Sequence, residues 1–189
     1  MPERFRPHVL GIDDGPFDKH ADARAPVVGV MMEGADLVEA VAITAFPVDG
    51  EDAARFLADW VGGLRFASAL HGVVLGGVTI AGLGVVDVAE MSRRLQLPVM
   101  VVNRKRPEDG PLVEALCAAG LEARIPILES APGAWETAEG LHVAHAGTSR
   151  EEAERTLSAT LNKSQLPEPL RLAHLVATAM ARGQSRGRP

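Results

Sequence analysis

The stretch VLGIDDGPF, residues 9–17, runs from apolar residues into two adjacent carboxylates and then into Gly-Pro. Its apolar part is typical of a buried strand, which Asp13 and Asp14 would end. Two neighbouring acids repel each other, and burying either of them without a partner is strongly unfavourable. The pair therefore lies either in a solvated Asx-type turn before Gly15 or beside a cation. This stretch alone leaves both readings open.

Two further strands follow the first one closely. Residues 26–33 and 37–48 are rich in apolar and β-branched residues, as strands are. The segment between them contains Gly34, which suits a hairpin turn that needs a positive φ. The first third of the chain therefore predicts three antiparallel strands.

The rest of the chain alternates between helical and strand patterns. Helical apolar spacing or capping residues predict helices over residues 50–64, 86–97, 111–120, 148–161 and 167–183, and apolar runs predict strands over residues 69–80, 98–103, 124–130 and 140–147. Asp87 and either Thr148 or Ser149 are the expected N-caps. Such alternation favours parallel strands with helices on the sheet faces. The whole pattern predicts an α/β, ribonuclease H-like fold, a mixed sheet flanked by helices.

Length and composition indicate one globular domain over residues 1–189. Hydrophobic residues make up 47% of the chain, which is enough for a sizeable core. No apolar run reaches the length of a membrane span, and the first residues lack a signal-peptide pattern. Cys117 is the single cysteine, so no internal disulfide can form. These features lead us to expect a cytoplasmic protein with Cys117 in its core.

The charge is distributed unevenly. A net charge of −6 argues against a broadly basic nucleic-acid surface. From Leu161 onward, however, the chain has five basic residues and one acid. We expect a flexible basic tail near residues 183–189, which is either simply solvated or in contact with phosphates.

Several side chains are candidate ligands for a divalent ion. Mg²⁺ prefers hard oxygen ligands, and the carboxylates must converge from separate elements. The candidates are Asp13 or Asp14 after the first strand, Asp49, Glu51 or Asp52 before the first helix, and His174 in the last helix. The acids before the helix equally fit a turn with a helix N-cap, and His174 equally fits a core histidine.

Six motifs occur in a fixed order along the chain: GIDDGPF (11–17), VDGED (48–52), GGVTIAGLGVVD (76–87), PVMVVNRKRP (98–107), LPEPLRLAHL (166–175) and SRGR (185–188). Together they resemble an uncharacterised-domain family related to endonuclease V, whose archaeal members are called endonuclease dU. The resemblance covers residues 6–188. It implies an endonuclease V-like fold and nicking of DNA, or of RNA, near a deaminated base such as deoxyuridine, with Mg²⁺ or Mn²⁺ as cofactor.

The resemblance also implies roles for individual residues. Asp13 is similar to the metal ligand on the first strand, and Asp49 to the acid that opens the first helix, with Asp14 and Asp52 as further ligands. Lys105 resembles a lysine that approaches the scissile phosphate. His174 stands where endonuclease V has an acid, as a ligand or a base. The implied substrate contacts are Arg104, Arg171 and Arg186.

One position departs from the family pattern. An acid of the family ends the central strand before a glycine, whereas this chain has Gly76-Gly77. A glycine offers no side-chain oxygen to a metal. A second hypothesis is therefore a nucleic-acid-binding member of the same fold with impaired catalysis. A third is a domain that binds a small molecule or a protein, because aromatic residues for base stacking are scarce.

Overall fold

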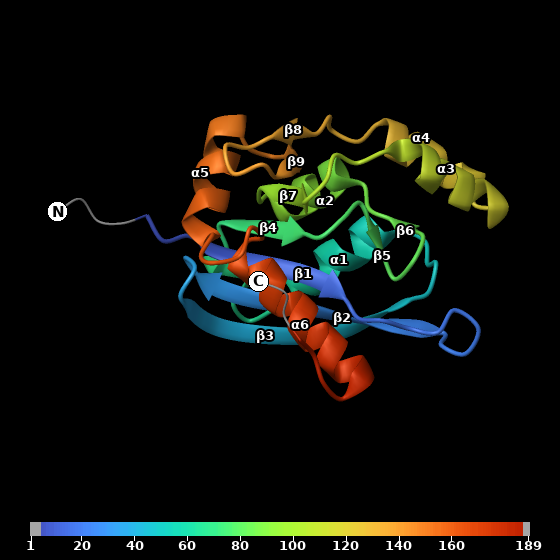
Figure 1. Ribbon diagram of the computed structural model, residues 1–189, viewed down its shortest axis with the longest axis horizontal. Coiled ribbons are helices and arrows are strands. Elements are labelled where there is room, and N and C mark those ends of the chain that lie inside the picture. The colour runs from blue at the N-terminus through green and yellow to red at the C-terminus, as the bar shows by residue number, and fades with distance from the viewer. Residues whose placement is uncertain (1–4, 187–189) are drawn as a thin grey trace.

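The computed structural model describes residues 5–186, and a seven-stranded mixed sheet forms its centre (Figure 1). Across the sheet the strands are β3 (Leu37–Pro47), β2 (Arg24–Glu33), β1 (His8–Asp14), β4 (Gly72–Leu75), β7 (Val99–Asn103), β9 (His142–Ala146) and β8 (Trp135–Glu136). A separate two-stranded sheet consists of β5 (Thr79–Ile80) and β6 (Gly84–Val85). The helices are α1 (Ala53–Gly62), α2 (Val88–Leu95), α3 (Asp109–Ala118), α4 (Ile125–Glu129), α5 (Arg150–Thr160) and α6 (Glu168–Arg182), with 3₁₀ turns at Ala67–Ala69 and Glu122–Arg124.

The strand pairing has the predicted ribonuclease H-like arrangement. Strands β1, β2 and β3 pair antiparallel in sequence order, and β4 and β7 then continue the sheet parallel to β1. Strand β9 pairs antiparallel with β7. The prediction of a mixed sheet flanked by helices is confirmed. In this arrangement the carboxyl ends of β1, β4 and β7 lie at one edge of the sheet.

Helices cover both faces of the sheet, which explains why β1 is apolar almost throughout. Leu10 and Ile12 point into a core shared with α1 and α2. Val9 points to the other face, into a cluster with α5 and the start of α6. In Figure 1, α6 crosses in front of β1 and β2, whereas α1 and α2 lie behind the sheet. The last helix of the chain is therefore laid against its first strand.

Several local signals in the sequence are confirmed. Gly34 has φ +61 in the β2–β3 turn. The Asp87 side chain accepts a hydrogen bond from the Glu90 N–H at 2.8 Å and caps α2. Of the two candidate caps for α5, Ser149 holds the cap position and accepts from Glu152 at 3.2 Å.

Other predictions about elements were wrong. The strand predicted over 69–80 ends at Leu75, because the Gly76-Gly77 pair leads the chain out of the sheet and into β5. The segment predicted as a strand over 124–130 forms a 3₁₀ turn and α4, since Pro126 suits the first turn of a helix. Cys117 is exposed rather than in the core, because α3 buries Leu116 instead. Among the described residues, no helix is long and apolar enough to cross a membrane.

Candidate functional site

The end of β1 meets the middle of α6 through a pair of side chains. Asp13 Oδ2 and His174 Nδ1 are 2.8 Å apart and form a hydrogen bond, although 161 residues separate them in sequence. The other oxygen of Asp13 accepts the backbone N–H of Asp14 at 3.1 Å. The side chain of Asp13 is 22% exposed and that of His174 is 63% exposed. The carboxylate is thus sheltered, while the imidazole faces solvent.

The pKa values of His174 and Asp14 are both raised, so protonation of either group is favoured. The hydrogen bond with Asp13 raises the pKa of His174, burial opposes this, and the charges of Asp13 and Asp14 reinforce it. Burial first and the nearby charge of Asp13 second raise the pKa of Asp14 to about 6. A backbone hydrogen bond from Ala81 lowers this pKa in part. Asp14 is therefore a carboxylate that a proton or a cation would stabilise.

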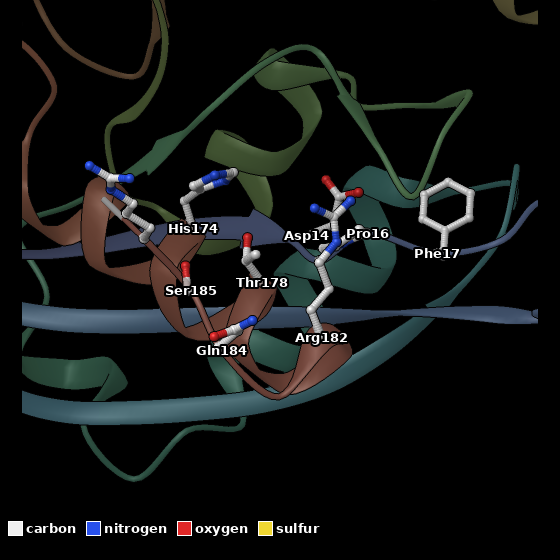
Figure 2. A pocket seen from close by; sticks show the side chains of 10 residues that line it. Asp14, Pro16, Phe17, His174, Thr178, Arg182, Gln184 and Ser185 are labelled. Carbon is white, nitrogen blue, oxygen red and sulfur yellow. The ribbon is translucent and has the colours of Figure 1, made fainter. Parts of the chain in front are cut away.

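Two cavities open on either side of His174. The smaller one, of about 380 Å³, lies among the ends of β1, β4 and β7 and the start of α6, and its lining includes Asp13, Gly76, Asn103, Arg104, Arg171, His174 and Arg186. The larger one, of about 1050 Å³, is lined by Asp14 to Phe17, His174, Thr178, Arg182 and Gln184 to Arg186. Figure 2 shows His174, Thr178 and Arg182 along α6, opposite Asp14 at the end of β1 and Phe17 in the loop that follows. Because His174 and Arg186 line both cavities, the two form one continuous candidate site.

Gly76 lies directly beside Asp13. A Cβ built on Gly76 would be 3.4 Å from Asp13 Oδ1 and 3.5 Å from Leu170 Cδ1, which are ordinary contact distances. A side chain would therefore fit here and would reach the Asp13 carboxylate. With glycine, the position that faces Asp13 from the neighbouring strand supplies no ligand.

Asp49 is held by a different part of the molecule. Its Oδ1 accepts the Leu83 N–H at 2.7 Å, and its backbone N–H donates to the Ala81 carbonyl at 2.9 Å. Arg124, which is buried, donates to the Asp49 carbonyl at 2.7 Å and to the Leu83 carbonyl at 2.6 Å. Because the Ala81 backbone also lowers the pKa of Asp14, the segment 81–83 lies near the end of β1 as well as being bonded to Asp49.

The remaining predicted ligand before α1 is exposed. Asp52 has φ +53, makes no side-chain cap, and lies 3.4 Å from Arg55. Within residues 5–186, the acidic and histidine donors that do gather in a group of three are His8, Glu33 and Glu39, at the other end of β1. The structure therefore joins Asp13 to His174, with Asp14 next along the chain, whereas the Asp49 carboxylate is bonded to the Leu83 N–H and Asp52 lies beside Arg55. Their roles as ligands stay predictions.

The side chains predicted to contact the substrate differ in how free they are to bind a phosphate. Arg104 and Lys105 are exposed in the loop after β7, and Arg104 lines the smaller cavity. Arg171 instead pairs in a bidentate manner with Glu168, at 2.6 Å and 3.0 Å, and Glu168 is buried. Its guanidinium is thus largely engaged at the start of α6.

The basic tail predicted near residues 183–189 starts beside the larger cavity. The main chain leaves α6 at Gly183, whose φ is +73, and residues 184–186 then line the larger cavity. Residues 187–189 of the predicted flexible tail lie outside the described residues, and flexibility stays a prediction.

Sequence reasoning missed some residues of this site. Thr178 and Arg182 follow His174 at intervals of four on α6, so helical spacing from His174 was a usable signal. Phe17 was quoted within a motif but given no role, and it is half-buried in the larger cavity. No local pattern marks Arg124, because its two acceptors come from distant segments.

The donor set at the end of β1 fits one divalent cation. Mg²⁺ is commonly bound through one or two carboxylates, with waters and substrate phosphate completing the shell. Asp13 and Asp14 offer two such carboxylates, and burial together with the charge of Asp13 raises the pKa of Asp14. A pair of ions would need a further carboxylate, which Gly76 does not offer.

Comparisons with known proteins agree on the family. The sequence model of the family described as Endonuclease dU matches residues 6–181. The chain is 35% identical over 183 residues to a UPF0215 protein of Methanothermobacter thermautotrophicus, a match that covers 95% of this chain and 90% of that one. It is 38% identical over 183 residues to a UPF0215 protein of Thermococcus gammatolerans, covering 94% and 93%.

Solved structures show the same fold. A crystal structure of a protein of unknown function from Archaeoglobus fulgidus has a TM-score of 0.83 and 33% identity, covering 92% of this chain and 97% of that one. Endonuclease V of Ciona intestinalis, in complex with a DNA that contains an inosine followed by a ribo-adenosine, has a TM-score of 0.56 and 14% identity, covering 89% and 82%. Because the identity to endonuclease V is only 14%, this comparison shows a shared fold and nothing more.

Proposed function

Because the chain belongs to the endonuclease dU family, we propose that it is a metal-dependent endonuclease that nicks DNA near deaminated bases such as deoxyuridine. The observation that supports this most directly is the Asp13–His174 hydrogen bond beside Asp14, at the edge of the sheet where two cavities meet. Membership of the family supports a nuclease-like activity, and the geometry supports an active site at the end of β1 beside α6.

Asp13 and Asp14 would hold the cation, Mg²⁺ or Mn²⁺. A divalent ion in a nuclease supplies positive charge to the scissile phosphate and makes a bound water more acidic. Both residues are partly buried and adjacent in sequence at the end of β1, so each would supply an oxygen ligand there. The ligand roles of Asp49 and Asp52 stay predictions from the family resemblance.

His174 would exchange a proton with the reacting groups. Its Nδ1 is bonded to Asp13, which fixes the ring and leaves Nε2 as the nitrogen that can give or take a proton. The raised pKa of His174 keeps it protonated closer to neutral pH, so the ring is suited to donate a proton or to attract a phosphate.

Basic side chains around the cavities would bind the nucleic-acid backbone. Arg104 and Arg186 line the smaller cavity, Arg182 lines the larger one, and Lys105 lies in the same loop as Arg104. Contacts of this kind neutralise phosphates and make binding depend on salt. Arg171 supports the site indirectly, because its pairing with Glu168 holds the start of α6.

A second function, nucleic-acid binding without efficient cleavage, is favoured by one observation. Gly76 lies beside Asp13 Oδ1, where there is room for a side chain, but glycine provides no carboxylate. Loss of a carboxylate beside the ion weakens metal affinity while leaving the basic groups in place.

Nicking assays separate these functions. Wild-type chain, Asp13→Ala and Asp109→Ala, the last a control at an exposed acid of α3, are incubated with oligonucleotides that contain deoxyuridine or deoxyinosine, in Mg²⁺ or Mn²⁺. Nicking by the wild type and the control but not by Asp13→Ala supports the endonuclease. Salt-dependent binding without nicking supports the second function. Absence of both nicking and binding, for DNA and RNA alike, would contradict both.

A further inference from the structure

We propose a second metal site, which binds a first-row divalent cation such as Zn²⁺ through His8, Glu33 and Glu39. One ligand atom from each of these residues lies within 4.8 Å of the others. His8 Nε2 and Glu39 Oε2 are 3.0 Å apart. The group lies at the amino end of β1, five residues from Asp13 and about 16 Å away at the usual rise of a strand. It is thus separate from the candidate active site.

The sheet register brings the three side chains together. His8 and Glu33 are opposite each other in the β1–β2 pairing. On the next strand the register shifts, because Met31 pairs with Ala40 whereas Met32 pairs with Val38. Glu39 is the extra residue of this bulge. A β-bulge changes the direction of a side chain, and here it accompanies the approach of Glu39 to His8 across β2.

Neighbouring residues hold these ligands in place. Arg6 donates to Glu33 Oε1 at 2.9 Å and to Asp36 at 3.0 Å, so one oxygen of Glu33 is anchored and Oε2 is left for another partner. The ring of His71 stacks on His8 with centroids 5.4 Å apart. His71 Nδ1 also accepts the backbone N–H of His8 at 3.0 Å. Such outer contacts are usual around metal ligands, because they fix ligand orientation.

The charge and donor types indicate the class of ion. Glu33, Glu39 and Asp36 bring three negative charges to this corner and Arg6 brings one positive charge, so a divalent ion would balance them. One imidazole nitrogen with two carboxylates suits Zn²⁺ or a similar transition metal, whereas Mg²⁺ and Ca²⁺ prefer oxygen alone. The side chains of His8, Glu33 and Glu39 are about 30% exposed, which leaves access for the ion and for water. Bound metal would fasten β1 to the β2–β3 hairpin.

The test is calorimetric titration of the full chain with Zn²⁺. The compared proteins are the wild type, Glu39→Gln, His8→Gln, Asp13→Asn and, as a matched control at an exposed glutamate, Glu122→Gln. We expect a Zn²⁺ site that persists in Asp13→Asn and Glu122→Gln and that loses at least tenfold in affinity in Glu39→Gln and His8→Gln. Zn²⁺ should also raise the melting temperature of the three proteins that retain the site, which are the wild type, Asp13→Asn and Glu122→Gln.

A second measurement needs no variant. Co²⁺ added to isotope-labelled wild-type chain should broaden the amide signals around His8, Glu33 and Glu39 at substoichiometric concentration. Undiminished Zn²⁺ affinity in both Glu39→Gln and His8→Gln would overturn the proposal. So would Co²⁺ broadening that spares these amides. Because neither readout involves nucleic acid, this outcome is independent of whether the chain is an endonuclease.

Discussion

Gly11 of β1 lies directly beneath the peptide that joins Pro169 to Leu170 at the start of α6. A Cβ on Gly11 would be 2.5 Å from the Pro169 carbonyl oxygen and closer still to the Leu170 nitrogen. Only the absence of a side chain lets the helix approach the strand so closely. The same approach brings His174 to Asp13, so a backbone contact sets the geometry of the candidate site.

Substitution of Gly11 tests this relationship. We expect Gly11→Ala to push α6 away from β1, to lower the free energy of unfolding by about 1–3 kcal/mol, as overpacking does, and to weaken the Asp13–His174 pair. Urea denaturation measures the first effect, and the His174 pKa by NMR measures the second. Gly62→Ala is the control, because nothing lies within 4 Å of its Cβ. A Gly11→Ala protein as stable as Gly62→Ala would contradict the account.

Asp14 should make stability depend on pH. Its pKa is raised to about 6 in the folded chain, from 3.8, so the folded state binds a proton more tightly than the unfolded state does. Stability from this group is therefore present at low pH and is lost as pH rises from about 4 through 6. Asp14→Asn removes the charge, and we expect it to raise the melting temperature, measured in EDTA, more at pH 7.5 than at pH 4.5. If the melting temperatures of the two proteins differ by the same amount at pH 4.5 and pH 7.5, the pKa of Asp14 is not raised by folding.

Restoring a carboxylate beside Asp13 should strengthen metal binding. Gly76→Asp places an oxygen next to Asp13, so we expect Mn²⁺ affinity to rise at least tenfold and, without metal, stability to fall through like-charge repulsion. Calorimetry with Mn²⁺ and thermal melting in EDTA measure the two effects. Gly77→Asp is the matched control, since a Cβ there meets only Thr79, at 3.9 Å. Equal Mn²⁺ affinity in both variants would show that position 76 does not face the ion.

Arg124 should hold the segment 81–83, which is bonded to Asp49. It donates to the carbonyls of Leu83 and Asp49, and its removal leaves both acceptors without this donor. Loss of a hydrogen bond to a charged group costs about 1.5–3 kcal/mol, so we expect Arg124→Met to destabilise the chain by an amount in this range or above. Hydrogen exchange should speed up at residues 81–83. Arg65→Met, at an exposed arginine, is the control, and equal exchange in both variants would contradict this role.

Patterns within short segments predicted the fold well. The apolar run before Asp13, the Gly34 turn and the caps at Asp87 and Ser149 all reflect local chemistry, and each is confirmed. The failures arose where local composition is ambiguous. The segment around Pro126 is as apolar as a strand, yet the proline suits a helix start, and Gly76 ends a strand whose apolar pattern continues beyond it.

The candidate site was predictable only in part. The pairing of Asp13 with His174 depends on the close contact at Gly11, which no sequence spacing reveals. Motif order drew attention to both residues, whose roles stay predictions, but it could not place Asp49, whose carboxylate is bonded to the Leu83 N–H. The group of His8, Glu33 and Glu39 could not be predicted from the sequence either, because its assembly depends on the strand register and on the shift between β2 and β3.

Asp13, Asp14 and His174 form the proposed site of metal-dependent nicking. The most direct measurement is the single-turnover rate on a duplex with one deoxyuridine in Mn²⁺, for the wild type, Asp13→Asn and His174→Gln, with Asp109→Asn as control. We expect nicking by the wild type and the control and at least a hundredfold slower nicking by the other two. Nicking at the wild-type rate by Asp13→Asn would contradict the account.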